Sequence, residues 1–101
     1  MIIINALRRD CNLEGIPLVL GELGEFLAKR NPISFFTLVN KELARTASEH
    51  SWMGLASSVS LTSNEGTLPG KDMNNLHFDS ASCREFGRRY FHVFLKLINK
   101  E

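Results

Sequence analysis

The sequence contains little cysteine and little net charge. Its 101 residues include only two cysteines, Cys11 and Cys83, which lie far apart and offer neither a disulfide framework nor the spacing of a zinc site. We therefore expect reduced thiols, for which a cytoplasm is the default compartment, and no metal or other cofactor. A formal net charge of +1 gives no electric field that would favour nucleic acid or an anionic membrane.

Long apolar runs are also missing. No stretch of the sequence has the length needed to span a bilayer. The short apolar run at residues 2–4 is followed rather than preceded by arginines, so it does not resemble a signal peptide. With 44% hydrophobic and 23% charged residues, the composition is typical of a globular protein, and 101 residues suffice for at most one small domain.

Hydrophobic patterns predict five elements in the order helix, strand, helix, strand, helix. The continuous apolar run that contains Pro17 is typical of a strand covered on both faces, and the proline belongs at the strand's start because it cannot donate to a ladder. Residues 62–76 are rich in Ser, Asn, Gly and Pro, which indicates a long loop. The helices are expected at residues 2–12, at 34–50 and from Asp79 or Ser80 onward, and the strands at 16–20 and 55–61.

The last helix has the clearest pattern. Ser82 and Glu85 have the spacing of a capping box. Gly87 lies in the helix interior, where it is unfavourable relative to alanine, and close packing against a sheet would explain it. The apolar stripe is formed by Phe86, Tyr90, Phe94 and Leu97 and is widened by Cys83, Gly87, Phe91 and Ile98.

The alternation of helices and strands predicts an α/β fold with parallel strands. Two strands are too few for an independently stable sheet. The whole chain, residues 1–101, is therefore expected to be one partial domain, the C-terminal portion of a larger three-layer α/β domain. An unfinished sheet of this kind would favour association with another copy or with a complementing N-terminal part.

Two stretches carry a resemblance to a known family. His77-Phe78 followed by Arg84-Glu85-Phe86-Gly87-Arg88-Arg89-Tyr90 resembles the last sequence block of the SGNH (GDSL-type) hydrolases. The match is nearest to the branch that holds the sialate O-acetylesterase-like and acetylxylan-esterase-like carbohydrate esterases. Gly21-Glu22-Leu23-Gly24-Glu25-Phe26 is similar to a second stretch of that branch. The resemblance covers roughly residues 3–98 and implies a flavodoxin-like parallel sheet.

The resemblance implies hydrolysis of acetyl esters on carbohydrates through an acyl-serine intermediate. His77 would be the general base and then the general acid, a role that its ordinary pKa near neutrality suits. The alternative is an exposed loop histidine without a task. Asn74 stands where the family has the aspartate that orients the histidine, and a neutral amide cannot stabilise an imidazolium by charge.

Another carboxylate would then have to orient the histidine. Glu22 is the preferred candidate, because it follows the first expected strand and would lie, like His77, at the C-terminal edge of the sheet. The alternative is a loop carboxylate that accepts hydrogen bonds from nearby amides. Asp72 and Asp79 are nearer in sequence, but Asp79 is better placed to cap the last helix.

The nucleophile is the main absence. The family's Gly-x-Ser block does not occur, and Ser57 and Ser60 fall in the second expected strand. This chain alone is therefore expected to be inactive as an ester hydrolase. The second interpretation is a non-catalytic α/β remnant that associates with itself or another chain. A third, a cysteine hydrolase using Cys83 and His77, is disfavoured because Cys83 fits the buried stripe.

The other polar residues support no further site. His50 and His92 show no ligand spacing. Arg84, Arg88 and Arg89 form a basic patch that we interpret as a solvated helix face, with Arg89 paired to Glu85 four residues before it.

Overall fold

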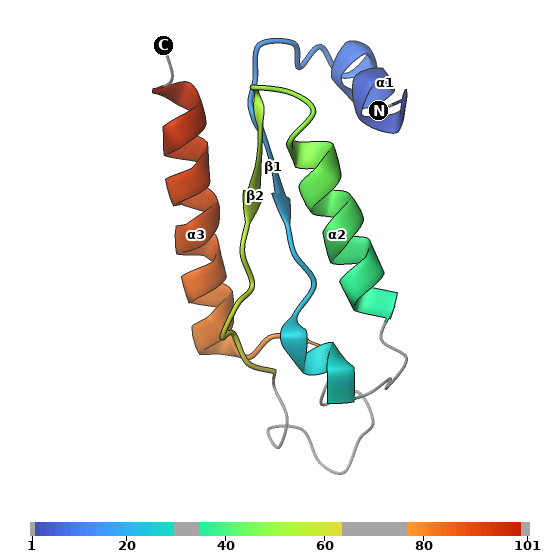
Figure 1. Cartoon of the computed structure of the whole chain (residues 1–101). Coiled ribbons are helices and arrows are strands. Elements are labelled where there is room, and N and C mark those ends of the chain that lie inside the picture. Colours follow the sequence, from blue (N-terminus) through green and yellow to red (C-terminus); the bar gives the residue numbers. More distant parts are fainter. Residues whose placement is uncertain (1, 30–34, 64–76, 100–101) are drawn as a thin grey trace.

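The computed structural model describes residues 2–29, 35–63 and 77–99. It is a small α/β structure with the predicted order of helices and strands and one additional 3₁₀ helix, η1 (Figure 1). The elements are α1 (Ile2–Asp10), β1 (Leu18–Gly21), η1 (Glu25–Lys29), α2 (Phe35–Ala47), β2 (Met53–Ala56) and α3 (Ser80–Ile98).

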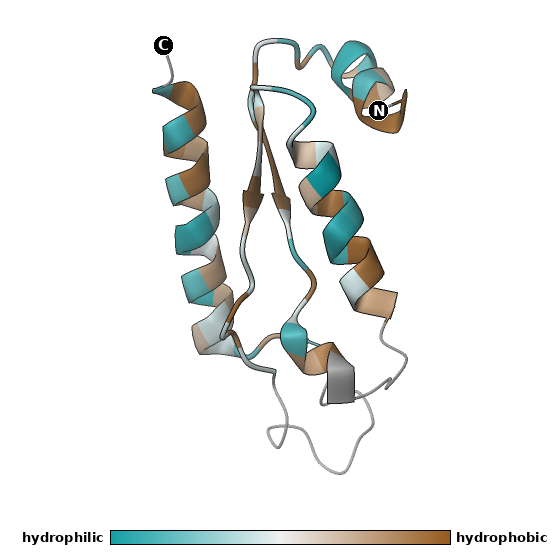
Figure 2. Ribbon diagram, viewed as in Figure 1, coloured by the Kyte–Doolittle hydropathy of each residue, from teal (hydrophilic) through white to brown (hydrophobic). Residues whose placement is uncertain are grey.

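The two strands pair in parallel, as predicted. Leu18 lies opposite Met53, and Gly21 lies opposite Ala56. The sheet stands between α3 on one side and α2 on the other (Figure 1). Because the strands are parallel, both end at the same edge of the sheet, and η1 and the start of α3 lie at that edge too. The ribbon of both strands is predominantly hydrophobic (Figure 2).

Two glycines bring the sheet close to α3. A Cβ atom on Gly21 would lie 1.8 Å from the Tyr90 hydroxyl oxygen, and one on Gly54 would lie 2.4 Å from a methyl carbon of Val93. Neither distance is compatible with a larger residue unless the Tyr90 or Val93 side chain, or α3 itself, shifts. Side chains alternate along a strand, so Val19, between Leu18 and Leu20, faces α3 with these glycines.

The core is small and lies mainly on the α3 side of the sheet. Ala56, Leu61 and Phe86 are buried, and Val19, Phe78, Tyr90 and Val93 pack around them. Met53 is also buried. On the other side, Leu38 and Val39 of α2 remain 59% and 43% exposed. Two strands give α2 too little sheet to cover its apolar face.

The prediction of a strand at 55–61 was wrong in its position. The strand ends at Ala56 because its partner β1 ends at Gly21. The chain then turns, and Ser60 takes a φ of 67°. The Ser58 amide donates to the Glu22 carboxylate and the Ser60 amide to the Glu25 carboxylate. These amides are therefore satisfied by side chains rather than by the carbonyls of a neighbouring strand.

Three expectations for the last helix were also wrong. The cap is Asp79, whose side chain accepts from the Ser82 amide, so Ser82 and Glu85 do not form a capping box. Cys83 is exposed rather than buried. A Cβ on Gly87 would meet no atom within 4 Å, so close packing does not explain this glycine. The stripe that faces the sheet is therefore narrower than predicted, and Phe91 is 58% exposed.

Among the helices of the described residues, none combines the length and the apolar character that crossing a membrane requires.

Candidate functional site

Three segments meet where the strands end. They are the turn after β1 with η1, the turn after β2, and residues 77–79, which lead into α3. The ring of Phe26 in η1 packs edge-on against Phe78 with ring centroids 5.1 Å apart. Phe78 in turn packs against Phe86 of α3, with ring centroids 5.0 Å apart. The two stretches that carry the family resemblance are therefore in contact here.

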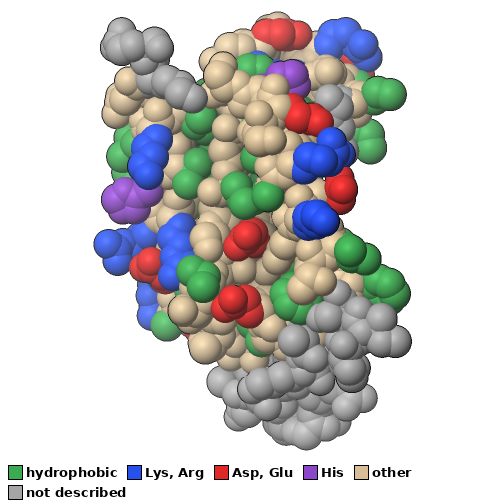
Figure 3. Space-filling view, in the orientation of Figure 1, with side chains coloured by type: hydrophobic (Ala, Val, Ile, Leu, Met, Phe, Trp, Pro, Cys, Tyr) green, Lys and Arg blue, Asp and Glu red, His purple; other side chains and the backbone are tan. Residues whose placement is uncertain are grey.

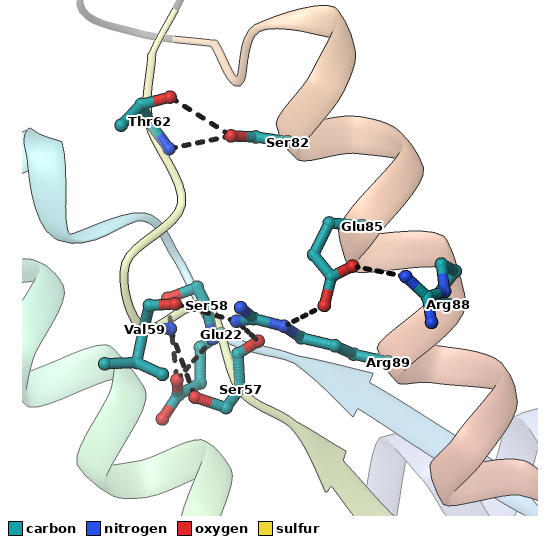
Figure 4. A network of polar contacts seen from close by, with 9 residues as sticks. All are labelled: Glu22, Ser57, Ser58, Val59, Thr62, Ser82, Glu85, Arg88 and Arg89. Carbon is teal, nitrogen blue, oxygen red and sulfur yellow. Dashed lines mark hydrogen bonds and ion pairs between the residues drawn. The ribbon is translucent and has the colours of Figure 1, made fainter.

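Glu22 binds the turn after β2. Its Oε1 atom accepts hydrogen bonds from the Ser58 amide (2.8 Å) and the Ser58 hydroxyl (3.5 Å), as Figure 4 shows. Ser58 is almost completely buried, at 1% exposure. Both bonds are made by Oε1, so a bond from His77 to this carboxylate would have to use Oε2.

Two further contacts hold the same turn. The Ser58 hydroxyl donates to the backbone carbonyl of Leu23 (2.7 Å). The side-chain amide of Asn40, on α2, brackets the Leu23 backbone by accepting from its N–H (2.8 Å) and donating to its C=O (3.1 Å). The Ser60 amide donates to Glu25 (2.8 Å). The turn after β1 is thus fixed from both α2 and β2.

Asp79 ties the start of α3 to the segment after β2. One carboxylate oxygen accepts from the Ser82 amide (2.7 Å), and the other accepts from the Thr62 hydroxyl. The Asp79 amide donates to the Thr62 carbonyl (3.1 Å), and Ser82 Oγ accepts from the Thr62 amide (2.8 Å). The Thr62 hydroxyl bond, and then the Ser82 amide, lower the pKa of Asp79 below its ordinary value.

The lowered pKa of Asp79 predicts a pH-dependent contribution to stability. In the unfolded chain the carboxyl group titrates near an ordinary pKa of about 3.9, and in the folded chain it titrates lower. The stabilisation is therefore complete above the unfolded pKa and is lost as the pH falls through the folded one. Asp79→Asn keeps the shape of the cap but cannot titrate.

We expect the melting temperature of wild type to exceed that of Asp79→Asn at neutral pH. The difference between the two melting temperatures should narrow as the pH falls through the acid range. Thermal melts of both proteins by circular dichroism across that range would measure this difference. A difference that stays constant with pH would contradict a charged Asp79 cap.

His77 lies at the same end of the sheet as Glu22, two residues before Asp79, and its side chain is exposed. Its neighbour Phe78 is well held: it forms an isolated antiparallel bridge with Ser63 and packs between Phe26 and Phe86. The sequence prediction that Glu22 and His77 share this edge is thus consistent with the arrangement. Asn74 and Asp72 lie outside the described residues.

Arg89 is not part of a solvated basic face. Its side chain is 25% exposed, against 72% for Arg88. It pairs with Glu85 (3.1 Å), as predicted, but its guanidinium also donates to the carbonyls of Ser57 (2.9 Å) and Val59 (2.8 Å) (Figure 4). In the space-filling view, basic side chains gather along α3 with acidic ones among them (Figure 3).

Sequence reasoning missed the roles of Ser58, Asn40 and Arg89. For Asn40 the local signal was a polar residue directly after the apolar pair Leu38 and Val39. Ser58 and Arg89 gave no such signal, because these partners lie thirty or more positions away in the chain.

The remaining candidate residues show no second site. Cys83 is exposed, and its sulfur lies 4.0 Å from the Phe78 carbonyl oxygen. At the opposite end of the sheet, His50 stacks on Trp52 with ring centroids 4.7 Å apart. The guanidinium carbon of Arg8 lies over Trp52, 3.7 Å from the ring centroid. Within residues 2–29, 35–63 and 77–99, no group of three or more His, Cys, Asp or Glu side chains could hold a metal ion.

Comparison with known proteins finds no family model that matches the chain and no matching curated protein.

Proposed function

We propose that the chain is the C-terminal portion of a flavodoxin-like SGNH hydrolase domain that acts as a carbohydrate O-acetylesterase. The chain would contribute His77 as general base and acid, and the serine would come from a separate N-terminal part. The substrate would be an acetylated carbohydrate.

One observation carries this proposal: the contact between the two stretches that resemble the family. Gly21 packs under Tyr90, and Phe26 packs against Phe78, although the stretches are far apart in sequence. They meet at the C-terminal edge of a parallel sheet, where ligands bind in open α/β folds. The packing of Phe78 would give the neighbouring His77 a defined backbone position, as a catalytic base requires.

Two side chains are candidates for orienting His77: Asn74 and Glu22. Asn74 would accept a hydrogen bond from the imidazole without stabilising its positive charge. Glu22 would supply the charge, but its bonds to Ser58 match the alternative interpretation of a carboxylate that accepts from nearby amides. We therefore assign Glu22 first to holding the turn, with Oε2 as the atom available to His77.

The first test is hydrolysis of p-nitrophenyl acetate by the purified chain beside a His77→Ala variant. We expect no rate above buffer for either protein, because the proposal places the serine and its oxyanion hole outside this chain. A rate that the variant loses would show that the nucleophile is present here. Cys83, which is exposed, would then be tested by Cys83→Ser.

The second test searches the nucleotide sequence upstream of Met1 for a Gly-x-Ser block. Its product, mixed with this chain, should release acetate from an acetylated xylan or sialic acid and should lose that activity with His77→Ala. A mixture whose activity is unaffected by the variant would contradict the role of His77.

A second candidate function is association without catalysis. It is favoured by large apolar side chains that the described residues leave in contact with solvent. Ile2 is 87% exposed, Phe35 60%, Leu38 59% and Phe91 58%. In the hydrolysis test this candidate gives the same null rate, so it is separated from the first by the mixing experiment.

A further inference from the structure

Among the described residues, no strand pairs with the outer edge of β1. Leu18 and Glu22 donate their amides to β2, at 3.0 Å to the Trp52 carbonyl and 3.1 Å to the Ala56 carbonyl. Successive residues of a strand direct their backbone groups to opposite edges, so Val19 and Gly21 direct theirs away from β2. The sheet of the described residues has only β1 and β2, and no strand among them covers this edge.

The open edge is limited at both ends. On one side Pro17 has no backbone N–H to donate. On the other side, both backbone groups of Leu23 are bonded to the side chain of Asn40. What remains is a slot of four backbone groups on Val19 and Gly21, and the slot is symmetric about Leu20.

The outer edge of β2 differs. The Met53 amide is already bonded to the His50 carbonyl (3.2 Å). The guanidinium of Arg89 occupies the Ser57 carbonyl (2.9 Å) and places a charge beside this edge. Charged side chains at an edge oppose the addition of a further strand. The sheet can therefore be extended at β1 more readily than at β2.

An apolar groove adjoins the open edge. Its volume is about 630 Å³, and Leu20 contributes to its wall together with Ile4 of α1 and Leu38, Val39 and Leu43 of α2. Leu20 is thus on the α2 side of the sheet. Hydrophobic colour marks β1, part of α2 and the start of α1 (Figure 2). A strand added at β1 would bring apolar side chains over this groove.

We propose that this surface binds a second copy of the chain, with the two β1 strands antiparallel about a two-fold axis at Leu20. Val19 of each copy would exchange two hydrogen bonds with Gly21 of the other, which uses all four groups of the slot. Leu20 would face Leu20 of the second copy as a non-hydrogen-bonded pair.

The slot itself selects a second copy over an unrelated strand. In this register Pro17 lies opposite Leu23 of the other copy. Pro17 has no N–H to donate, and the backbone groups of Leu23 are already bonded to Asn40, so neither residue loses a hydrogen bond by facing the other. A two-fold contact requires such self-complementarity, whereas an unrelated strand would not need ends equidistant from Leu20. The result is a four-stranded sheet, β2-β1-β1-β2. The inference concerns the chain by itself, because an N-terminal part that added its strand at β1 would take the place of the second copy.

Disulfide trapping tests the register. Both native cysteines are exposed, so the background is Cys11→Ser with Cys83→Ser. Leu20→Cys should form a disulfide dimer on mild oxidation, because the Cβ atoms of such a pair are about 5 Å apart. Leu55→Cys is the matched control, since Leu55 pairs with Leu20 on the same face of the sheet. Its copies would be three strand spacings apart, about 14 Å, and should cross-link at least tenfold less.

Light scattering coupled to size exclusion provides the second test. We expect wild type at twice its chain mass of 11.4 kDa. Leu38→Lys, beside the groove, should raise the dissociation constant at least tenfold. Phe91→Lys, on α3, should leave it unchanged, although the two side chains are equally exposed at 59% and 58%. Circular dichroism verifies that both variants remain folded.

Several outcomes would overturn the proposal. They are a monomer at all concentrations, equal cross-linking of Leu20→Cys and Leu55→Cys, and equal weakening by Leu38→Lys and Phe91→Lys. A monomer that instead binds an extended peptide at β1 would also overturn it, in favour of a different occupant.

Discussion

Phe86→Ala is expected to lower the free energy of unfolding by about 3–5 kcal/mol, the usual cost of removing a buried phenylalanine ring. Phe86 is 8% exposed and belongs to the core with Ala56 and Leu61. Its ring centroid lies 5.0 Å from that of Phe78 and 4.9 Å from that of Tyr90. Removing the ring would therefore leave a cavity directly beside the segment that carries His77. Because few of the described residues are buried, few neighbouring side chains are placed to collapse into the space.

Urea unfolding followed by circular dichroism measures this loss. The control is Phe91→Ala, five residues along the same helix and 58% exposed, which should change the free energy of unfolding by less than about 0.5 kcal/mol. Similar losses in both variants would mean that α3 does not pack on the sheet through the Phe86 face.

The sequence was sufficient to predict the elements whose signals are local. The helix starting next to Asp79, the proline before β1 and the parallel order of the strands all follow from capping, backbone chemistry and the alternation of helices with strands. The proposed SGNH relationship rests instead on the two resembling stretches.

The errors arose where long-range contacts decide the structure. Alternation after Leu55 indicated a strand, but a strand extends only as far as its partner, and β1 ends at Gly21. Cys83 has the helical spacing of the buried stripe, yet it lies in the first turn of α3, near the end of the sheet, and is exposed. Periodicity identifies a face of a helix, but the extent of the opposing sheet decides which residues of that face are buried.

The candidate site was predictable in its place and not in its hydrogen bonds. Strand order alone placed Glu22 and His77 at one edge of the sheet. The bonds from Ser58 to Glu22 and from Arg89 to Ser57 join residues more than thirty positions apart, and no local pattern encodes them. These bonds identify Glu22 first as a structural residue of the turn.

Gly21→Ala is expected to destabilise the fold by about 1–3 kcal/mol, the cost of overpacking a filled site. The new methyl group would lie 1.8 Å from the Tyr90 hydroxyl oxygen and 2.5 Å from the ring carbon that bears it. Removing the hydroxyl alone would therefore not relieve the clash. The Phe86 ring would also lie 3.1 Å from the added methyl group, so a shift of Tyr90 alone would leave this contact tight.

A double-mutant cycle isolates this contact. In a Tyr90→Ala background, Gly21→Ala should cost much less, because the two closest atoms that the methyl group meets are gone. Gly87→Ala is the same chemical change in the interior of α3, where a Cβ would meet nothing within 4 Å. There alanine should stabilise the chain by about 0.8–1 kcal/mol through helix propensity. Opposite signs at the two glycines would establish that Gly21 is required by the contact with Tyr90, which joins the two stretches that resemble the esterases. Equal signs would show that this contact does not hold them together.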